Sequence, residues 1–286
     1  MRISFCFCQF EIKQVKTVMK RFFSDLKKFG DYITYAARSE LKAEVAGSFL
    51  NWLWWFLDPL LYMLVYSFIA LLVFKTGEPH FSVFVFIGLN VWHFFSKTIK
   101  ISVRLVALNK NIVTKVYIPK HMFVLSKMCV LAFKMFVSFG LTAIFLICDG
   151  VFKDPVHISY KILYVIPLFA LLFVVTFAVS LFIMHFGVFI EDLNNVISVV
   201  LQLGFYASGI FYSIENRLKD GATWVAKILT NVNPVAMIMA DMRSVIIGGD
   251  NIHLLSFAIW SVIAVVAAYF GIKLIYKFEN SYVKII

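Results

Sequence analysis

Six long apolar segments constrain this chain more than any other feature of its sequence. Each is about as long as the roughly 20-residue helix needed to cross the hydrocarbon core of a bilayer. They are residues 49–74, 81–106, 122–147, 161–186, 194–213 and 253–276. Only 15% of the 286 residues are charged, well below the share of about 25% in soluble domains. The sequence therefore predicts an all-α polytopic membrane protein with six transmembrane helices.

The polar stretches around these segments divide the chain into three parts. Residues 1–48 precede the first span, and within them 10–29 has an apolar stripe opposite a lysine-rich face. That pattern predicts an amphipathic helix on a membrane surface or on a partner protein. Residues 49–276 hold the six spans, and 277–286 form a tail. Most Lys and Arg lie on the side of the two termini, so the positive-inside bias predicts that both termini are cytoplasmic.

The connection between the fifth and sixth spans predicts a helix too short to cross the membrane. Asn233 and Pro234 are a favourable cap and first turn, and Gly248-Gly249 is a favourable stop. The residues between them rise about 21 Å. One face of this helix holds Val235, Ile238, Met239, Met242 and Ile246. We expect an amphipathic helix that enters the outer leaflet part-way, with a second short helix around 222–229.

Charged residues inside the spans are the first candidates for function. Lys134 lies near the middle of the third span, where a lysine costs roughly 2.5–3.5 kcal/mol on insertion scales. Asp58 lies just before Pro59 in the first span. Two alternatives stay open for this acid. It either pairs with Lys134 or Lys127 beside a proline kink, or it couples transport to protons.

Further basic and aromatic residues predict a pathway for an anionic cargo. The predicted pathway residues are Lys97, Lys100, Arg104, Lys127, Lys134, Trp92, Tyr206 and Tyr212. The alternative for most of the cations is that long side chains snorkel to the headgroups. The alternative for the aromatic residues is an interfacial belt.

The sequence lacks the common motifs of enzymes and metal sites. It contains no G-x-x-x-x-G-K-[ST] phosphate loop, so we expect neither ATP nor Mg bound to this chain. The histidines form no nucleophile–base pattern, and the four cysteines have no zinc spacing. We therefore expect no catalytic residue, no metal and no cofactor. The net charge of +11 fits membrane topology, lipid headgroups or an anionic cargo, and we expect no nucleic-acid partner.

A basic strip, residues 109–120 (NKNIVTKVYIPK), lies between the second and third spans. It contains no acid and, by the charge bias, lies in the cytoplasm. An excess of lysine in a segment held between two long helices would complement an acidic groove on a partner.

Several stretches, taken in order, resemble the ABC-2-type permeases. They are residues 47–66, 85–95, 109–120, 191–193 and 233–249. Among these permeases the chain most resembles the bacterial exporters of O-antigen, capsule and teichoic acid. Glu191-Asp192 departs from the Arg-Asp that this family often has.

The resemblance implies a homodimer in which each permease engages a separate ATPase, where ATP and Mg bind. The strip would be the coupling helix, with contacts from Asn109, Lys110, Asn111, Lys115, Tyr117, Pro119 and Lys120. Residues 31–46 would be an interface helix on the cytoplasmic leaflet, and 222–247 would hold two re-entrant helices. Structural or gating roles would fall to Asp58, Pro59, Asn233, Pro234 and Arg243.

The expected function is export of a lipid-linked, anionic polysaccharide or teichoic-acid-like polymer across the bacterial cytoplasmic membrane. The permease would also contact membrane lipids. Three alternatives remain: an exporter of a drug or lipid, an ion-coupled flippase that uses Asp58, and a membrane-embedded acyl- or glycosyltransferase.

Overall fold

The computed structural model describes residues 17–46, 50–73, 80–152, 160–212, 230–248 and 252–285, and all regular structure in these ranges is helical. The all-α prediction is confirmed for this part of the chain. The short helix expected around 222–229 lies outside the described residues, as does the start of the helix expected over 10–29.

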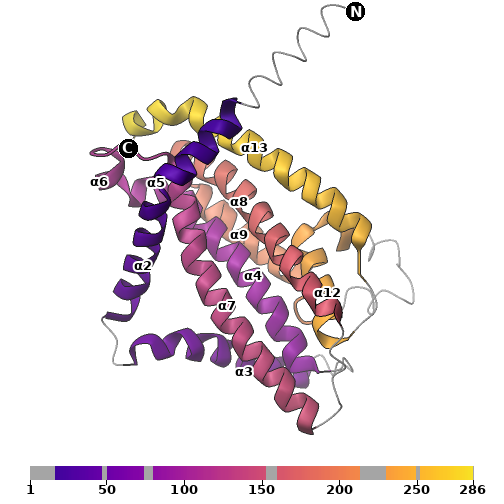
Figure 1. Cartoon of the computed structure of the whole chain (residues 1–286). Coiled ribbons are helices and arrows are strands. Elements are labelled where there is room, and N and C mark those ends of the chain that lie inside the picture. The colour runs from indigo at the N-terminus through magenta and orange to yellow at the C-terminus, as the bar shows by residue number, and fades with distance from the viewer. Residues whose placement is uncertain are drawn as a thin grey trace, which may run out of the picture.

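Within the described residues, four helices are long and apolar enough to cross a membrane. They are α4 (Phe81–Val103), α7 (Lys120–Phe152), α8 (Val165–Phe189, preceded by the 3-10 helix η2, Tyr160–Tyr164) and α13 (Leu254–Ile285). They run together along the long axis of the molecule, and α8 packs against α4, α7 and α13 (Figure 1). Four of the six predicted spans are therefore confirmed by length and composition.

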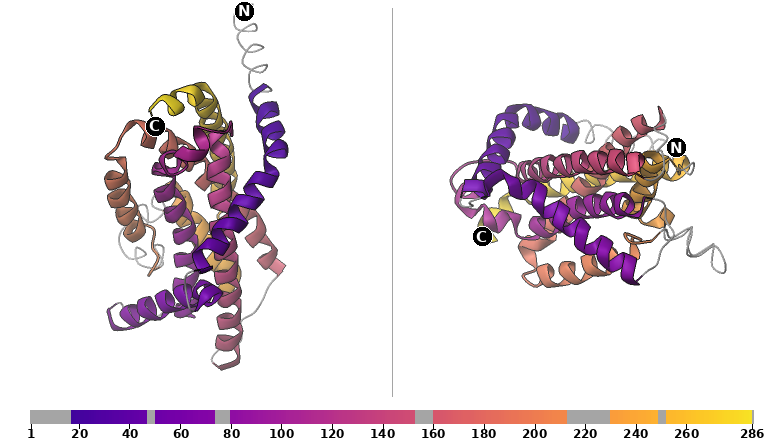
Figure 2. Two further views of the ribbon diagram at one scale, coloured as in Figure 1. Left: turned by 90° about the vertical axis from the view of Figure 1, so that its left-hand side faces the viewer. Right: turned by 90° about the horizontal axis from the view of Figure 1, so that it is seen from below.

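The other two predicted spans are helical, but their apolar stretches are shorter. The first forms α3 (Trp54–Val73), preceded by the 3-10 helix η1 (Asn51–Leu53), and the fifth forms α9 (Leu193–Ala207). Their apolar stretches are Trp54–Val65 and Leu193–Ala207. Helix α3 lies across one end of the bundle rather than along it (Figures 1 and 2). Helix α9 ends before the predicted residue 213, because the chain turns at Gly209, which has a φ of 67°.

The close contact between α8 and α13 follows from small residues on α13. Ala264 and Ala268 are buried, and Gly271 faces Leu181 of α8. A Cβ on Gly271 would lie 2.9 Å from the Cβ of Leu181. Small residues at helical spacing let helix backbones approach each other in apolar surroundings. Gly271 therefore lets α13 pack closely against α8.

The helix over residues 17–28, the C-terminal part of α13 and the basic strip meet at one end of the bundle (Figure 1). Residues 17–28 form a helix, and α2 (Gly30–Ala46) follows after a break at Phe29 and packs on α7. The predicted interface segment 31–46 is therefore helical. The strip begins after α5 (Leu105–Leu108) and contains α6 (Lys110–Val113). The predicted tail from 277 is a continuation of α13 as far as Ile285.

Helix α12 (Pro234–Ile247) has the predicted bounds. The Asn233 side chain accepts hydrogen bonds from the backbone N–H groups of Val235 (3.0 Å) and Ala236 (3.3 Å), and Gly248 ends the helix at φ 94°. The expectation that α12 is amphipathic is wrong. Asp241 and Arg243 are buried like the apolar face, because α4, α8 and α13 pack around the helix.

Candidate functional site

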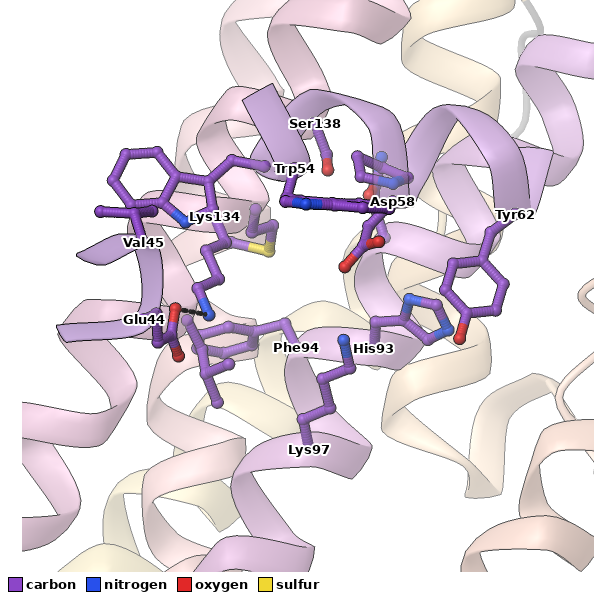
Figure 3. Close-up of a pocket in the computed structure, with 15 residues that line it drawn as sticks. Glu44, Val45, Trp54, Asp58, Tyr62, His93, Phe94, Lys97, Lys134 and Ser138 are labelled. Carbon is purple, nitrogen blue, oxygen red and sulfur yellow. Dashed lines mark ion pairs between the residues drawn. The ribbon is translucent and has the colours of Figure 1, made fainter. Parts of the chain in front are cut away.

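A charged cavity of about 360 Å³ lies between α2, α3, α4 and α7 (Figure 3). Its ionisable lining residues are Glu44, Asp58, His93, Lys97 and Lys134. Its aromatic lining residues are Trp54, Trp55, Tyr62 and Phe94. Two cations and two acids from four different helices thus share one cavity.

Two ion pairs fasten α2 to α7 beside this cavity. Lys134 Nζ lies 2.5 Å from Glu44 Oε2, and Lys127 Nζ lies 2.6 Å from Glu40 Oε1. The acids are one helical turn apart and the lysines two turns apart, so each set falls on one face. Of the alternatives left open for Asp58, an ion pair with Lys134 or Lys127 is not the one that forms, because acids of α2 take both lysines.

Lys97 is the cation that faces Asp58. In Figure 3 the Lys97 side chain rises from α4 toward the Asp58 carboxylate. Its charge also interacts with Glu44 and Lys134. Beside it, the rings of Tyr62 and His93 meet edge to face at 5.4 Å. Pro59, directly after the acid, lies inside α3 and also lines the cavity.

A buried amide completes the lining. Asn90 is only 6% exposed, and its Nδ2 has no hydrogen-bond partner within the described residues. A buried donor without a partner is costly, on the order of 1–3 kcal/mol. A polar ligand or water in the cavity would satisfy it.

A second cavity of about 310 Å³ lies on the other side of α4, against α9. We call it the α4–α9 cavity. Its lining includes Trp92, Lys97, Lys100 and Tyr206, four of the predicted pathway residues. Trp92 is largely buried and fits over Gly204, where a Cβ would lie 2.8 Å from the indole ring. Lys97 lines both cavities, so the two cavities share this one side chain.

The remaining predicted pathway residues lie outside both cavities. Arg104 is exposed at the C-terminal end of α4. Lys127 pairs with Glu40, as described above. Tyr212 donates a hydrogen bond to the backbone carbonyl of Tyr206 (3.0 Å), which places it at the edge of the α4–α9 cavity.

The basic strip presents part of its predicted surface to solvent. Lys110, Asn111, Lys115 and Tyr117 are exposed. Asn109 is half-buried, and its Nδ2 donates to the Leu105 carbonyl (2.8 Å). Pro119 and Lys120 are buried, and Lys120 donates to the Ile118 carbonyl at 3.4 Å. The strip therefore offers its first two lysines to a partner, and its last lysine faces inward.

Arg243 joins three segments at the opposite end of the bundle. From α12 its guanidinium donates to the carbonyls of Phe84 (3.0 Å), Gly209 (2.9 Å) and Ile210 (2.8 Å). It also lies over the Phe84 ring at 3.6 Å. Gly88 on α4 leaves room for it, since a Cβ there would collide with Arg243 Nη2. Arg243 thus links α12 to α4 and to the segment after α9, and its structural or gating role stays a prediction.

Sequence reasoning missed Glu40, Glu44 and the contact between Asp241 and His253. The His253 ring nitrogen Nδ1 lies 2.7 Å from Asp241 Oδ1 at the start of α13. The spacing of Glu40 and Glu44, on a helix preceding a lysine-bearing span, was an available signal. No signal in the sequence indicated the contact between Asp241 and His253, because twelve residues separate the two partners.

Long apolar helices with charged residues lying between them are typical of a multi-pass membrane protein. Proteins with similar sequences indicate which class of membrane protein this chain resembles. The chain is 25% identical over 227 residues, 79% of its length and 84% of the relative, to the O-antigen export system permease protein RfbA of Myxococcus xanthus. It is 26% identical over 220 residues, 77% of its length and 81% of the relative, to the protein of that name in Klebsiella pneumoniae. No protein-family model matches the chain. The resemblance to ABC-2-type polysaccharide export permeases is thereby confirmed.

Proposed function

We propose that this chain is the membrane-spanning subunit of an ATP-driven exporter whose cargo is a lipid-linked, anionic polysaccharide or teichoic-acid-like polymer. The observation that carries the proposal is the similarity, over 77–79% of the chain, to permeases named for O-antigen export. In this proposal the chain is a transport subunit and not an enzyme.

The two cavities beside α4 are the proposed contact region for the cargo. Trp54, Trp55 and Phe94 supply aromatic faces on which sugar rings stack, and Asn90 supplies an unsatisfied donor for a hydroxyl. Lys97 and Lys100 supply cations for phosphate or carboxylate groups. A polar, partly anionic glycan uses all three kinds of group, whereas a lipid or an apolar drug uses few of them.

A second copy of the chain is the proposed partner of α3 and α9. Both helices border the face of α4 that carries Lys97. Exposed apolar residues on α9 are Val196, Val199, Val200 and Leu203, at the spacing of one helical face. Exposed apolar residues on α3 include Leu61, Leu64, Val65, Phe68 and Ile69. Two copies meeting here would enclose the cavities between them rather than open them to lipid.

An ATPase subunit is the proposed partner of the basic strip. Exposed Lys110 and Lys115 would meet acidic residues of that subunit, and ATP and Mg would bind there. The strip and both termini would then lie on the cytoplasmic side of the bacterial inner membrane. This assignment agrees with the positive charge bias of that end.

The test is export of surface glycan from cells that lack the native gene. The Lys97→Gln/Lys100→Gln variant should lower surface glycan at normal permease level. The control, Lys277→Gln/Lys284→Gln, removes two exposed cations from the end of α13 and should export normally. Normal export by the first variant would exclude the proposed pathway. Export that persists when the ATPase partner carries an inactive phosphate loop would favour the ion-coupled alternative.

A further inference from the structure

Three segments that are far apart in the sequence meet at Arg21. This residue lies on the N-terminal helix (17–28), and its Nη2 donates to the Tyr117 hydroxyl of the basic strip (2.7 Å) and to Glu279 Oε2 on α13 (3.0 Å). The guanidinium also lies over the Tyr276 ring at 4.0 Å. We call Arg21, Asp25, Tyr117, Tyr276 and Glu279 the Arg21 cluster.

The contacts of the cluster hold the guanidinium in one position. Tyr276, whose ring lies under Arg21, donates its hydroxyl proton to Asp25 Oδ2 (2.6 Å), and Arg21 Nε lies 3.8 Å from the same carboxylate oxygen. Only 10% of the Glu279 side chain is exposed. Its other oxygen, Oε1, is buried with no hydrogen-bond partner in the described part of the chain. Arg21 thus supplies a cation in direct contact with Glu279, and its Nη2 also donates to the Tyr117 hydroxyl.

Tyr117 is the point at which the strip enters the cluster. Burial raises the pKa of its hydroxyl, and the Glu279 carboxylate raises that pKa further. The phenol therefore stays protonated near neutral pH, accepts from Arg21 and directs its own proton toward Glu279. Tyr117 is nevertheless 55% exposed, and it lies two residues from the exposed Lys115. A partner that moves the strip would move Tyr117 with it.

The cluster provides a route from the strip to α13. The strip continues directly into α7 but is separated from Glu279 by more than 150 residues of sequence. Helix α13 packs closely on α8 where Gly271 faces Leu181. The Arg21 side chain is therefore the one link between Tyr117 of the strip and Glu279 of α13 that these hydrogen bonds define.

We propose that Arg21 is a positioning residue that transmits movement of the basic strip to α13 during transport. The inference rests on the proposed function, because it requires a partner that moves the strip. It adds a role for the N-terminal helix as the connecting piece between the strip and the last helix.

The test uses the full permease–ATPase complex, and it measures export and ATP hydrolysis in the same vesicles. Arg21→Gln should lower export about five-fold or more, with the ATPase still bound and still hydrolysing ATP. Arg38→Gln, which removes an exposed arginine from α2, is the matched control and should export normally. Tyr117→Phe keeps the ring, removes only the hydroxyl, and should give a smaller loss in the same direction.

Three outcomes would overturn the inference: normal export by Arg21→Gln, loss of export caused by loss of the bound ATPase, or a fall in permease level that accounts for the whole effect. A double-mutant cycle strengthens the test. If the two residues act as one link, Arg21→Gln/Glu279→Gln should be no worse than the more impaired single variant. Additive losses would also contradict the inference. Failure of the proposed function would give a different result from failure of this inference. In that case the unaltered complex itself would export no glycan.

Discussion

The Lys134 ammonium on α7 lies 2.5 Å from the Glu44 carboxylate on α2. The lysine that lies deepest in a predicted span thus has its counter-charge on a segment outside the six predicted spans. Helix α2 is therefore fastened to α7 by this pair and by Glu40 with Lys127. Lys134 lines the cavity beside α2.

The first prediction tests this pair through stability. Lys134→Met should lower the free energy of unfolding by about 1–2 kcal/mol, less than the 3–5 kcal/mol of a fully buried pair. The expected loss of unfolding free energy is smaller than for a buried pair because the side chains of Lys134 and Glu44 are 30% and 38% exposed. Thermal unfolding of the purified permease in detergent measures the loss.

Two double variants test which carboxylate loses its partner in Lys134→Met. Adding Glu44→Gln to Lys134→Met removes the unpaired carboxylate and should restore most of the lost stability. Adding Asp58→Asn instead should not, because Asp58 is not the partner of Lys134. Restoration by Asp58→Asn alone would contradict the pairing.

A second prediction concerns the space that Gly88 leaves for Arg243. Gly88→Ala should destabilise the protein by about 1–3 kcal/mol, because the added methyl collides with a guanidinium held by three backbone carbonyls. Gly140→Ala is the matched control, since nothing lies within 4 Å of its added Cβ. That change should stabilise α7 by about 0.5–1 kcal/mol through helix propensity. Equal effects of the two substitutions on thermal unfolding would rule out the predicted collision.

A third prediction tests the orientation of the bundle. The background is a functional permease without its cysteines, which are Cys6, Cys8, Cys129 and Cys148. Tyr160→Cys, 89% exposed before α8, should react with a membrane-impermeant thiol reagent on intact cells. Lys115→Cys in the basic strip should react only after lysis. Asp241→Cys should react slowly in both cases, because this position is fully buried. The opposite pattern for the first two would invert the proposed topology.

The sequence predicted the parts of this fold that depend on local signals. The Asn233 cap, Pro234 and Gly248 set the bounds of α12, because capping chemistry acts within a few residues. The length of the apolar segments predicted the helices α4, α7, α8 and α13. The burial of Asp241 and Arg243 was not predictable in this way, because it depends on which helices surround α12.

In the candidate site, too, the sequence predicted some features and missed others. The α4–α9 cavity brings together four of the eight predicted pathway residues, Trp92, Lys97, Lys100 and Tyr206. Their role in transport stays a prediction. Among the pairings that escaped prediction are Lys134 with Glu44 and Tyr117 with Arg21. Each joins segments separated by 90 or more residues, and hydropathy carries no information about contacts of that kind.

The last prediction separates the two kinds of lysine in the basic strip. Lys110 and Lys115 are exposed, whereas Lys120 is 2% exposed and directs its ammonium toward the Ile118 carbonyl. Lys110→Glu/Lys115→Glu should therefore weaken stimulation of the ATPase and export while leaving thermal unfolding unchanged, because only an acidic partner surface is affected. Lys120→Glu should instead lower the unfolding temperature and the permease level, because it places an acid in a buried site near Glu279. Lys42→Glu, an exposed charge reversal on α2, controls for net charge and should leave both readouts unchanged. If the Lys110/Lys115 variant retains full export and full ATPase stimulation, the partner contacts another surface, and the strip has no coupling role.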